Sequence, residues 1–151
     1  MPNVKIHQNN NNLYVEEIDV GEEKPRQVCS GLVKHVSIEE MKDRLVVVVC
    51  NLKPAKFKGF ISEAMVLVAF NENDSVVEPI NPPIDSVVGV KLVVNNYTGE
   101  AGTLLDWKKI YNVLKLDLKT NNDKVACYKG LPIKNDKGNC TVKTLNNSYI
   151  G

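Results

Sequence analysis

The sequence predicts a mainly β fold, an all-β barrel with only two short helices. Short apolar runs rich in β-branched residues recur along the 151 residues, and turn residues separate them. Helix signals stand at only two places, one beginning at Ser37 and the other at Asp106. This combination favours a barrel over an alternating strand and helix arrangement. The length is sufficient for one compact, self-sufficient core.

The first elements form a hairpin followed by a helical turn. Residues 13–20 have strand-like character, residues 21–25 supply turn chemistry with glycine and proline, and residues 26–32 are again extended. The segment Ser37-Ile-Glu-Glu40 matches a capping box, which predicts a short helix that includes Met41. Residues 1–12 are polar and lack the pattern of a secretory signal, so we expect a loose N-terminus.

Two more strand regions follow in the middle of the chain. Residues 45–50 form a valine run, which predicts a strand buried on both faces, and residues 51–59 then predict a polar loop. Residues 60–70 return to apolar character, and residues 71–75 supply a turn before Val76 and Val77. We expect a second hairpin at this turn.

The consecutive prolines Pro82 and Pro83 exclude the segment of residues 81–89 from the interior of a sheet because they remove ladder donors. Residues 87–94 can form a strand after them. We therefore place the end of the barrel near Asn95, with a barrel over residues 1–95 and a C-terminal extension over residues 96–151 packed on it.

The extension is predicted to begin with a helix and to continue with short strands. Asp106 caps a pattern with apolar residues at i, i+3, i+4 and i+7, namely Trp107, Ile110, Tyr111 and Leu114. Residues 125–128, 130–133 and 140–145 are predicted strands, and residues 135–138 form a turn between the last two.

The composition is that of a soluble globular protein, with 43% hydrophobic and 25% charged residues. No apolar run approaches the ~20 residues that a membrane span requires. Three of the four cysteines lie in apolar runs and none forms a Cys-x-x-Cys pair, so we expect reduced structural thiols in a reducing compartment.

The sequence offers little for catalysis. The two histidines are His7 and His35, and neither stands in a recognisable arrangement with a nucleophile and an orienting group. The acidic residues Glu16, Glu17 and Asp19 alternate between strand faces and lack the spacing of a metal site. No glycine-rich phosphate loop is present. We therefore predict a domain that is not an enzyme and that needs no metal or cofactor.

The distribution of charge is more informative than the net charge of +1. Residues 13–24 are acidic, whereas residues 51–62 carry Lys53, Lys56 and Lys58 and no carboxylate. Three lysines together can neutralise several phosphates and release their counterions. They are equally well explained as ordinary solubilising charge.

Four segments of the chain carry a family pattern, namely residues 13–22 (LYVEEIDVGE), 30–33 (SGLV), 51–56 (NLKPAK) and 59–65. In these segments the chain resembles the endothelial monocyte-activating polypeptide II type of tRNA-binding domain. The resemblance continues through Trp107 and through residues 126–148, and so covers nearly everything after residue 13. The chain departs from the family in residues 1–12, which predicts a first barrel strand that is shortened or irregular.

The resemblance implies a five-stranded OB-fold barrel with a C-terminal extension of short strands and a helix. It also implies general, largely sequence-independent tRNA binding by a cytoplasmic domain. Such a domain is appended to an aminoacyl-tRNA synthetase, with the methionyl enzyme as the first candidate, or to a synthetase cofactor. A monomer is implied, because the extension is thought to mimic the interface of the dimeric bacterial members. The expected RNA contacts are Asn51, Lys53, Lys56, Lys58, Ser62, Met65 and Lys34.

Two other functions remain open from the sequence. One is a protein-interaction scaffold of a multi-synthetase complex, with the Pro82–Pro83 loop and the helix from Trp107 to Lys115 as docking elements. The other is a generic single-strand binder. It ranks last because aromatics make up only 6% of the chain and most of them lie in apolar runs.

Overall fold

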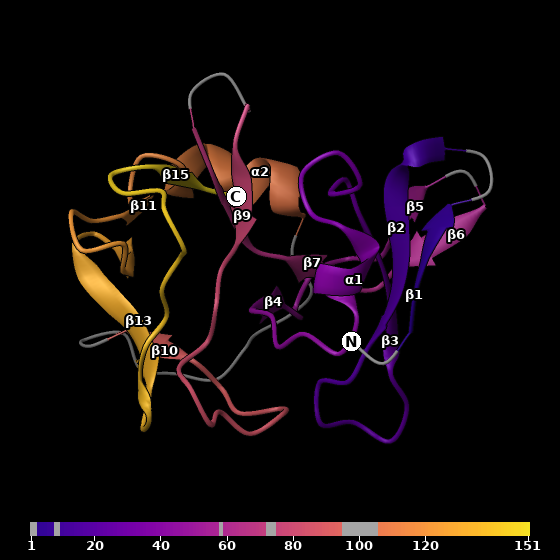
Figure 1. Ribbon diagram of the computed structural model, residues 1–151, viewed down its shortest axis with the longest axis horizontal. Helices are drawn as coiled ribbons and strands as arrows, with labels where there is room; N and C mark the ends of the chain where they lie inside the picture. The colour runs from indigo at the N-terminus through magenta and orange to yellow at the C-terminus, as the bar shows by residue number, and fades with distance from the viewer. Residues whose placement is uncertain (1–2, 8–9, 58, 72–74, 95–105) are drawn as a thin grey trace.

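The structure is a computed structural model that describes residues 3–7, 10–57, 59–71, 75–94 and 106–151. The predicted mainly β class is confirmed, with two helices among many short strands in these ranges. Strands from the first part of the chain gather on one side of Figure 1 and those of the C-terminal part on the other, with β4 and β7 between them. The described hydrogen bonds group these strands into separate sheets. The closed five-stranded barrel remains a prediction.

The N-terminal sheet is antiparallel and consists of β1 (Asn3–His7), β2 (Asn10–Ile18) and β3 (Arg26–Ser30), in that order. The hairpin between β2 and β3 confirms the prediction for residues 13–32. The expectation of a loose N-terminus was wrong for residues 3–7, because the backbone of β1 pairs with β2 from Asn3 opposite Glu17 onward.

The helix α1 (Ile38–Met41) begins where the capping box predicted it. The Ser37 hydroxyl accepts a hydrogen bond from the backbone N–H of Glu40 at 3.3 Å. Met41 then lies fully buried in a core cluster with Tyr14, whose hydroxyl donates to the Val36 carbonyl at 2.6 Å. This bond fastens the segment before α1 to the N-terminal sheet.

The middle of the chain forms shorter strands than the apolar runs predict. Only Val48–Val49 of the predicted strand 45–50 is regular, as β4, although the carbonyl of Val47 accepts from the N–H of Leu67. Leu45 is 42% exposed, so burial on both faces was wrong at this end of the run. The remaining strands here are β5 (Ala55–Phe57), β6 (Phe60–Ser62), β7 (Met65–Val66), β8 (Val68–Phe70) and β9 (Val77–Pro79). The predicted hairpin is present as β8 paired with β9, and residues 72–74 of its turn lie outside the described residues.

The largest sheet joins the C-terminal strands to the middle of the chain, in the order β10-β13-β12-β11-β15-β8-β9, with β14 beside β13. The new strands are β10 (Val93–Val94), β11 (Leu118–Thr120), β12 (Ala126–Tyr128), β13 (Leu131–Asn135), β14 (Gly138–Asn139) and β15 (Tyr149–Ile150). Strands were predicted at β12 and β13, whereas β11 and β15 were missed. The predicted strand 140–145 is wrong, because only Thr141 forms isolated bridges there, and the strand 87–94 shrinks to β10.

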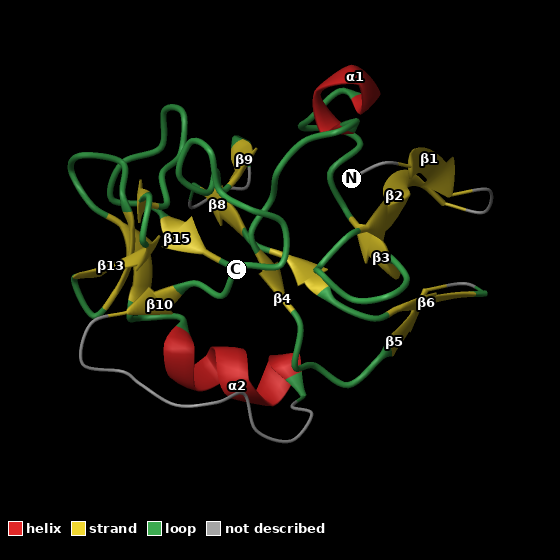
Figure 2. Cartoon of the chain, turned by 90° about the horizontal axis from the view of Figure 1, so that it is seen from below, coloured by secondary structure: helices red, strands yellow, loops and turns green. Residues whose placement is uncertain are grey.

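The predicted helix is present as α2 (Trp107–Leu114) and lies alongside the sheet that contains β10 and β15 (Figure 2). Leu114 packs against a second core cluster that combines Leu67 and Ile80 with Ala126 and Ile150. The two predicted parts of the chain therefore share one core and one sheet. The division near Asn95 stays a prediction, because residues 95–105 lie outside the described residues.

All four cysteines are free thiols, and Cys29, Cys127 and Cys140 are buried. Burial raises the pKa of the Cys140 thiol to about 11, which keeps it protonated and unreactive. Within the described ranges, neither helix is long and apolar enough to cross a membrane.

Glu16 is a buried acid in the core of the N-terminal sheet. Its side chain has no exposed surface, and the Ser30 hydroxyl donates to its Oε1. Its Oε2 has no hydrogen-bond partner among the residues that the structure describes. Burial raises the pKa of this carboxyl from its ordinary value of 4.5 to about 8, although the Ser30 hydrogen bond opposes the shift. Glu16 is therefore mainly protonated in the folded protein at neutral pH.

This buried acid predicts that Glu16→Gln stabilises the protein at high pH. Below pH 4.5 both states of the wild type are protonated, and between 4.5 and about 8 only the unfolded state loses its proton. Stability of the wild type should therefore fall with rising pH, by at most ~1.4 kcal/mol per pH unit. Glutamine carries no such proton. Urea unfolding at pH 5 and at pH 8.5 measures the free energy of unfolding of both proteins. The variant should gain stability relative to wild type at pH 8.5. An equal stability difference between the two proteins at both pH values would contradict the account.

Candidate nucleic-acid interface

The basic segment 51–59 was predicted as a loop, and the structure corrects this for its second half. Ala55–Phe57 forms β5 and pairs with β6, so that Lys56 stands opposite Ile61. Gly59 occupies the turn with a φ of +95°, a conformation that favours glycine. The prediction failed because a three-residue strand leaves too short a pattern to separate from a loop. A hairpin carries the segment instead.

The described side chains that face solvent on this hairpin are basic or apolar. Lys53 and Lys56 are exposed, and Ile61 is 50% exposed opposite Lys56. Lys58 lies outside the described residues. No carboxylate stands between residues 51 and 62. The hairpin can therefore offer phosphate oxygens a cationic surface with an apolar side chain beside it.

Arg26 ties both ends of the hairpin segment to the N-terminal sheet. Its guanidinium donates to the carbonyl of Cys50 at 2.7 Å and to the carbonyl of Glu63 at 3.0 Å. It also donates two hydrogen bonds to the carboxylate of Glu22, at 2.7 and 2.8 Å. This hydrogen-bonded pair lowers the pKa of Glu22 and raises that of Arg26. The Arg26 side chain thus holds the acidic turn and the two backbone carbonyls on either side of the basic hairpin.

Ser62 secures the hairpin from inside. It is 5% exposed, its hydroxyl accepts from the N–H of Cys29 at 2.9 Å and donates to the carbonyl of Ala64 at 2.9 Å. Beside it, the Gln27 amide donates to the carbonyl of Ile61 at 2.8 Å. These bonds hold β6 against β3.

The remaining predicted contacts lie around the hairpin. Asn51 is half-buried where the segment begins, and Met65 is half-buried in β7 opposite Val49. Lys34 is exposed in the turn after β3. The structure therefore groups Asn51, Lys53, Lys56 and Ser62 on one hairpin segment, and places Met65 and Lys34 on neighbouring elements.

Comparison with known proteins decides the family. The family model described as "Putative tRNA binding domain" matches residues 2–91. The chain belongs to this tRNA binding domain family. It is 44% identical to methionine–tRNA ligase, cytoplasmic, of Arabidopsis thaliana over 91% of this domain and 17% of that protein. It is 46% identical to aminoacyl tRNA synthase complex-interacting multifunctional protein 1 of Mus musculus, over 97% of this domain and 47% of that protein.

A solved structure has the same fold. The crystal structure of the C-terminal domain of Plasmodium vivax p43 is 31% identical, with a TM-score of 0.88, and the match covers 99% of this chain and 91% of that one. Both curated relatives are much longer than the tRNA binding domain, which spans less than half of either. The domain is thus a binding module that recurs within larger proteins.

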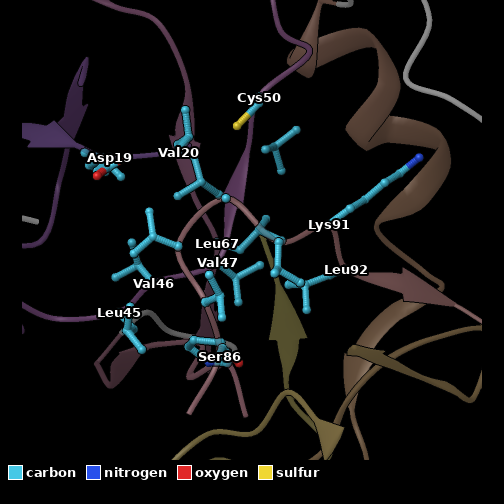
Figure 3. A pocket seen from close by; sticks show the side chains of 18 of the residues that line it. Asp19, Val20, Leu45, Val46, Val47, Cys50, Leu67, Ser86, Lys91 and Leu92 are labelled. Carbon is cyan, nitrogen blue, oxygen red and sulfur yellow. The ribbon is translucent and has the colours of Figure 1, made fainter. Parts of the chain in front are cut away.

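A cavity of about 700 Å³ lies beside the hairpin base of this tRNA binding domain. Figure 3 shows Val47, Leu67 and Leu92 pointing toward one another in it, whereas Lys91 extends away. The backbones of Gly21 and Gly89 touch at its edge, where a Cβ on Gly89 would lie 2.8 Å from the Gly21 Cα. Within the described part of the chain, no group of three or more His, Cys, Asp or Glu residues could hold a metal ion. The cavity is mainly apolar, and charged side chains such as Arg26 and Arg44 complete its lining.

Sequence reasoning missed Arg26 and Gln27, which position the candidate site. A signal existed for Arg26, because the oppositely charged Glu22 lies four residues before it, in the predicted turn. No signal pointed to the carbonyls of Cys50 and Glu63, which lie far away in the sequence.

The two hydrogen bonds of the buried Ser62 hydroxyl predict that Ser62→Ala destabilises this domain. Loss of the hydroxyl leaves the Cys29 N–H without its partner in a buried place, at a cost of roughly 1–3 kcal/mol. Urea unfolding measures this change. The control Ser75→Ala removes an exposed hydroxyl that accepts from the Asn71 amide at 2.8 Å, and it should cost less than Ser62→Ala because water can replace that bond. Equal stability of the two variants would contradict the positioning role.

Proposed function

We propose that this domain binds tRNA through a basic surface made of Lys34, Lys53 and Lys56, with Lys58 as a further predicted member. The observation that carries the proposal is the anchored hairpin, which presents exposed lysines on a segment that Arg26 and Ser62 hold in place. Rigid presentation limits the conformational entropy lost on binding.

The charges of this surface are available to a ligand. Lys34, Lys53 and Lys56 are exposed, and no carboxylate of the described residues pairs with them. Lysine contacts phosphate oxygens as a point charge and carries little sequence information. Binding should therefore depend on charge and on the shape of the RNA more than on base identity.

The other predicted residues take different parts in the proposal. Asn51 can donate its amide to sugar or phosphate at the base of the hairpin. Ser62 is assigned a positioning role, because both hydrogen bonds of its buried hydroxyl are made within the protein. Direct contact of Ser62 and Met65 with RNA stays a prediction.

The biological setting follows from the relatives. We infer that the domain forms part of a cytoplasmic aminoacyl-tRNA synthetase or of a cofactor of the synthetase complex. Among the synthetases, the methionyl enzyme is the first candidate. In either place the domain raises the local tRNA concentration for a catalytic module, and weak binding is sufficient for that effect. The domain performs no chemistry itself, and we expect it to be a monomer.

The salt dependence of tRNA affinity tests this proposal. The triple variant Lys53→Ala, Lys56→Ala, Lys58→Ala should bind several tRNAs more weakly than wild type. The slope of log affinity against log salt should be shallower by about one for each phosphate that the variant no longer neutralises. Fluorescence anisotropy over a range of salt concentrations measures both quantities.

A matched control separates local contacts from net charge. The variant Lys109→Ala, Lys115→Ala, Lys137→Ala removes the same charge from exposed positions in and after α2 and on the turn between β13 and β14. It should keep the slope of wild type. If both triple variants lose affinity equally, the hairpin is not the specific contact surface.

One observation favours a second candidate function, a protein-interaction domain of a synthetase complex. Large aliphatic side chains that line the cavity of Figure 3 are exposed, namely Leu45, Val87, Val88 and Val90, and Ile84 and Val93 on the same stretch of chain are exposed as well. Such a patch is typical of an interface. This function would be favoured over the first if the domain bound a synthetase module with an affinity that does not change with salt and had no affinity for tRNA.

A further inference from the structure

A second groove, of about 470 Å³, opens between β3, the strands β7 to β9 and the last residue of the chain. Its walls include Met65, Val68, Phe70 and Val77, and its polar groups come from Ser30 and His35. The volume lies within the ~300–1,000 Å³ typical of ligand sites. No described side chain that lines it is a carboxylate. The groove therefore suits a flat, mainly apolar group.

An aromatic and cationic row leads away from this groove. Phe70 stands opposite Tyr149, and Tyr149 stands opposite Lys119, on adjacent strands of the large sheet. The Phe70 and Tyr149 rings stack with centroids 5.8 Å apart, and the Lys119 ammonium lies 5.4 Å from the centre of the Tyr149 ring. Lys34 is next to His35, a residue that lines the groove, and both are exposed. One exposed cation thus adjoins the groove in the chain, and a second one, Lys119, ends the aromatic row.

We propose that this groove receives an unpaired base of the bound tRNA, stacked against Phe70 and Met65 while Lys34 contacts its phosphate. The inference rests on the proposed function and adds a base contact to it. Proteins recognise unpaired RNA bases by stacking them on aromatic side chains, with cations on the adjoining phosphates. The polarizable sulfur of Met65 adapts to the face of any base. The pocket would therefore add affinity for unpaired nucleotides with little base specificity.

Gly31 allows the groove to be blocked without disturbing the fold. It lines the groove, it is exposed, and a Cβ placed on it would meet no described atom within 4 Å. Its φ is not among the positive values that favour glycine. Gly31→Trp should therefore fold while its indole occupies space at the groove, and Gly31→Ala is the matched control.

The experiment compares two RNAs with these two variants and wild type. Affinities for a tRNA and for a fully paired RNA duplex are measured by anisotropy at one salt concentration and over a salt series, after thermal melts show that all three proteins fold. Gly31→Trp should bind tRNA about ten-fold more weakly than Gly31→Ala, the loss expected when one stacked base is excluded. Its affinity for the duplex should not change.

Each other outcome has a separate meaning. If Gly31→Trp and Gly31→Ala bind tRNA equally, the base pocket is overturned and the basic surface stands. An equal loss of affinity for tRNA and duplex also overturns the pocket, because it shows a general steric effect. If wild type binds neither RNA, the proposed function fails and the pocket fails with it.

Discussion

The candidate interface depends on the guanidinium of Arg26. That group joins the Glu22 carboxylate, the Cys50 carbonyl and the Glu63 carbonyl, three points that are far apart in the sequence. Hydrogen bonds from a charged donor are stronger than neutral ones, and the pairing with Glu22 orients the planar guanidinium. Because the two carbonyls bracket the segment that carries Lys53 and Lys56, the position of the basic hairpin relative to the sheet is fixed at both ends. The buried Ser62 hydroxyl adds a second attachment on the inner side.

The arrangement of charge explains how a domain with a net charge of +1 can belong to a tRNA binding family. Glu22 of the acidic turn is paired with Arg26, so that its carboxylate is engaged at the base of the hairpin. Lys53 and Lys56 have no such partner among the described residues. The charge of the surface next to the ligand, more than the net charge of the domain, determines how many counterions binding can release. The buried, mainly protonated Glu16 adds no negative charge at neutral pH.

Elements with strong local signals could be predicted from the sequence, and elements that depend on distant partners could not. The capping box at Ser37, the hairpin of β2 and β3 and the helix α2 all carry their information within a few residues. By contrast, β11 and β15 are very short strands whose pairing is decided by the large sheet. The strand predicted at residues 140–145 failed for the same reason, since apolar residues there fill the shared core without a continuous ladder. For the site, the lysines were visible in the sequence, whereas the burial of Ser62 and the carbonyls bound by Arg26 required the fold.

Amide hydrogen exchange with and without tRNA tests the central claim most directly, because it reports on every part of the chain at once. The account predicts that tRNA slows exchange in residues 51–62 and around residues 34–35, with little change in α2 and in the turn between β13 and β14. No slowing of exchange in the hairpin segment would contradict the account. Slowing confined to residues 84–93 would contradict it as well and would place the contact surface on the exposed aliphatic side chains there.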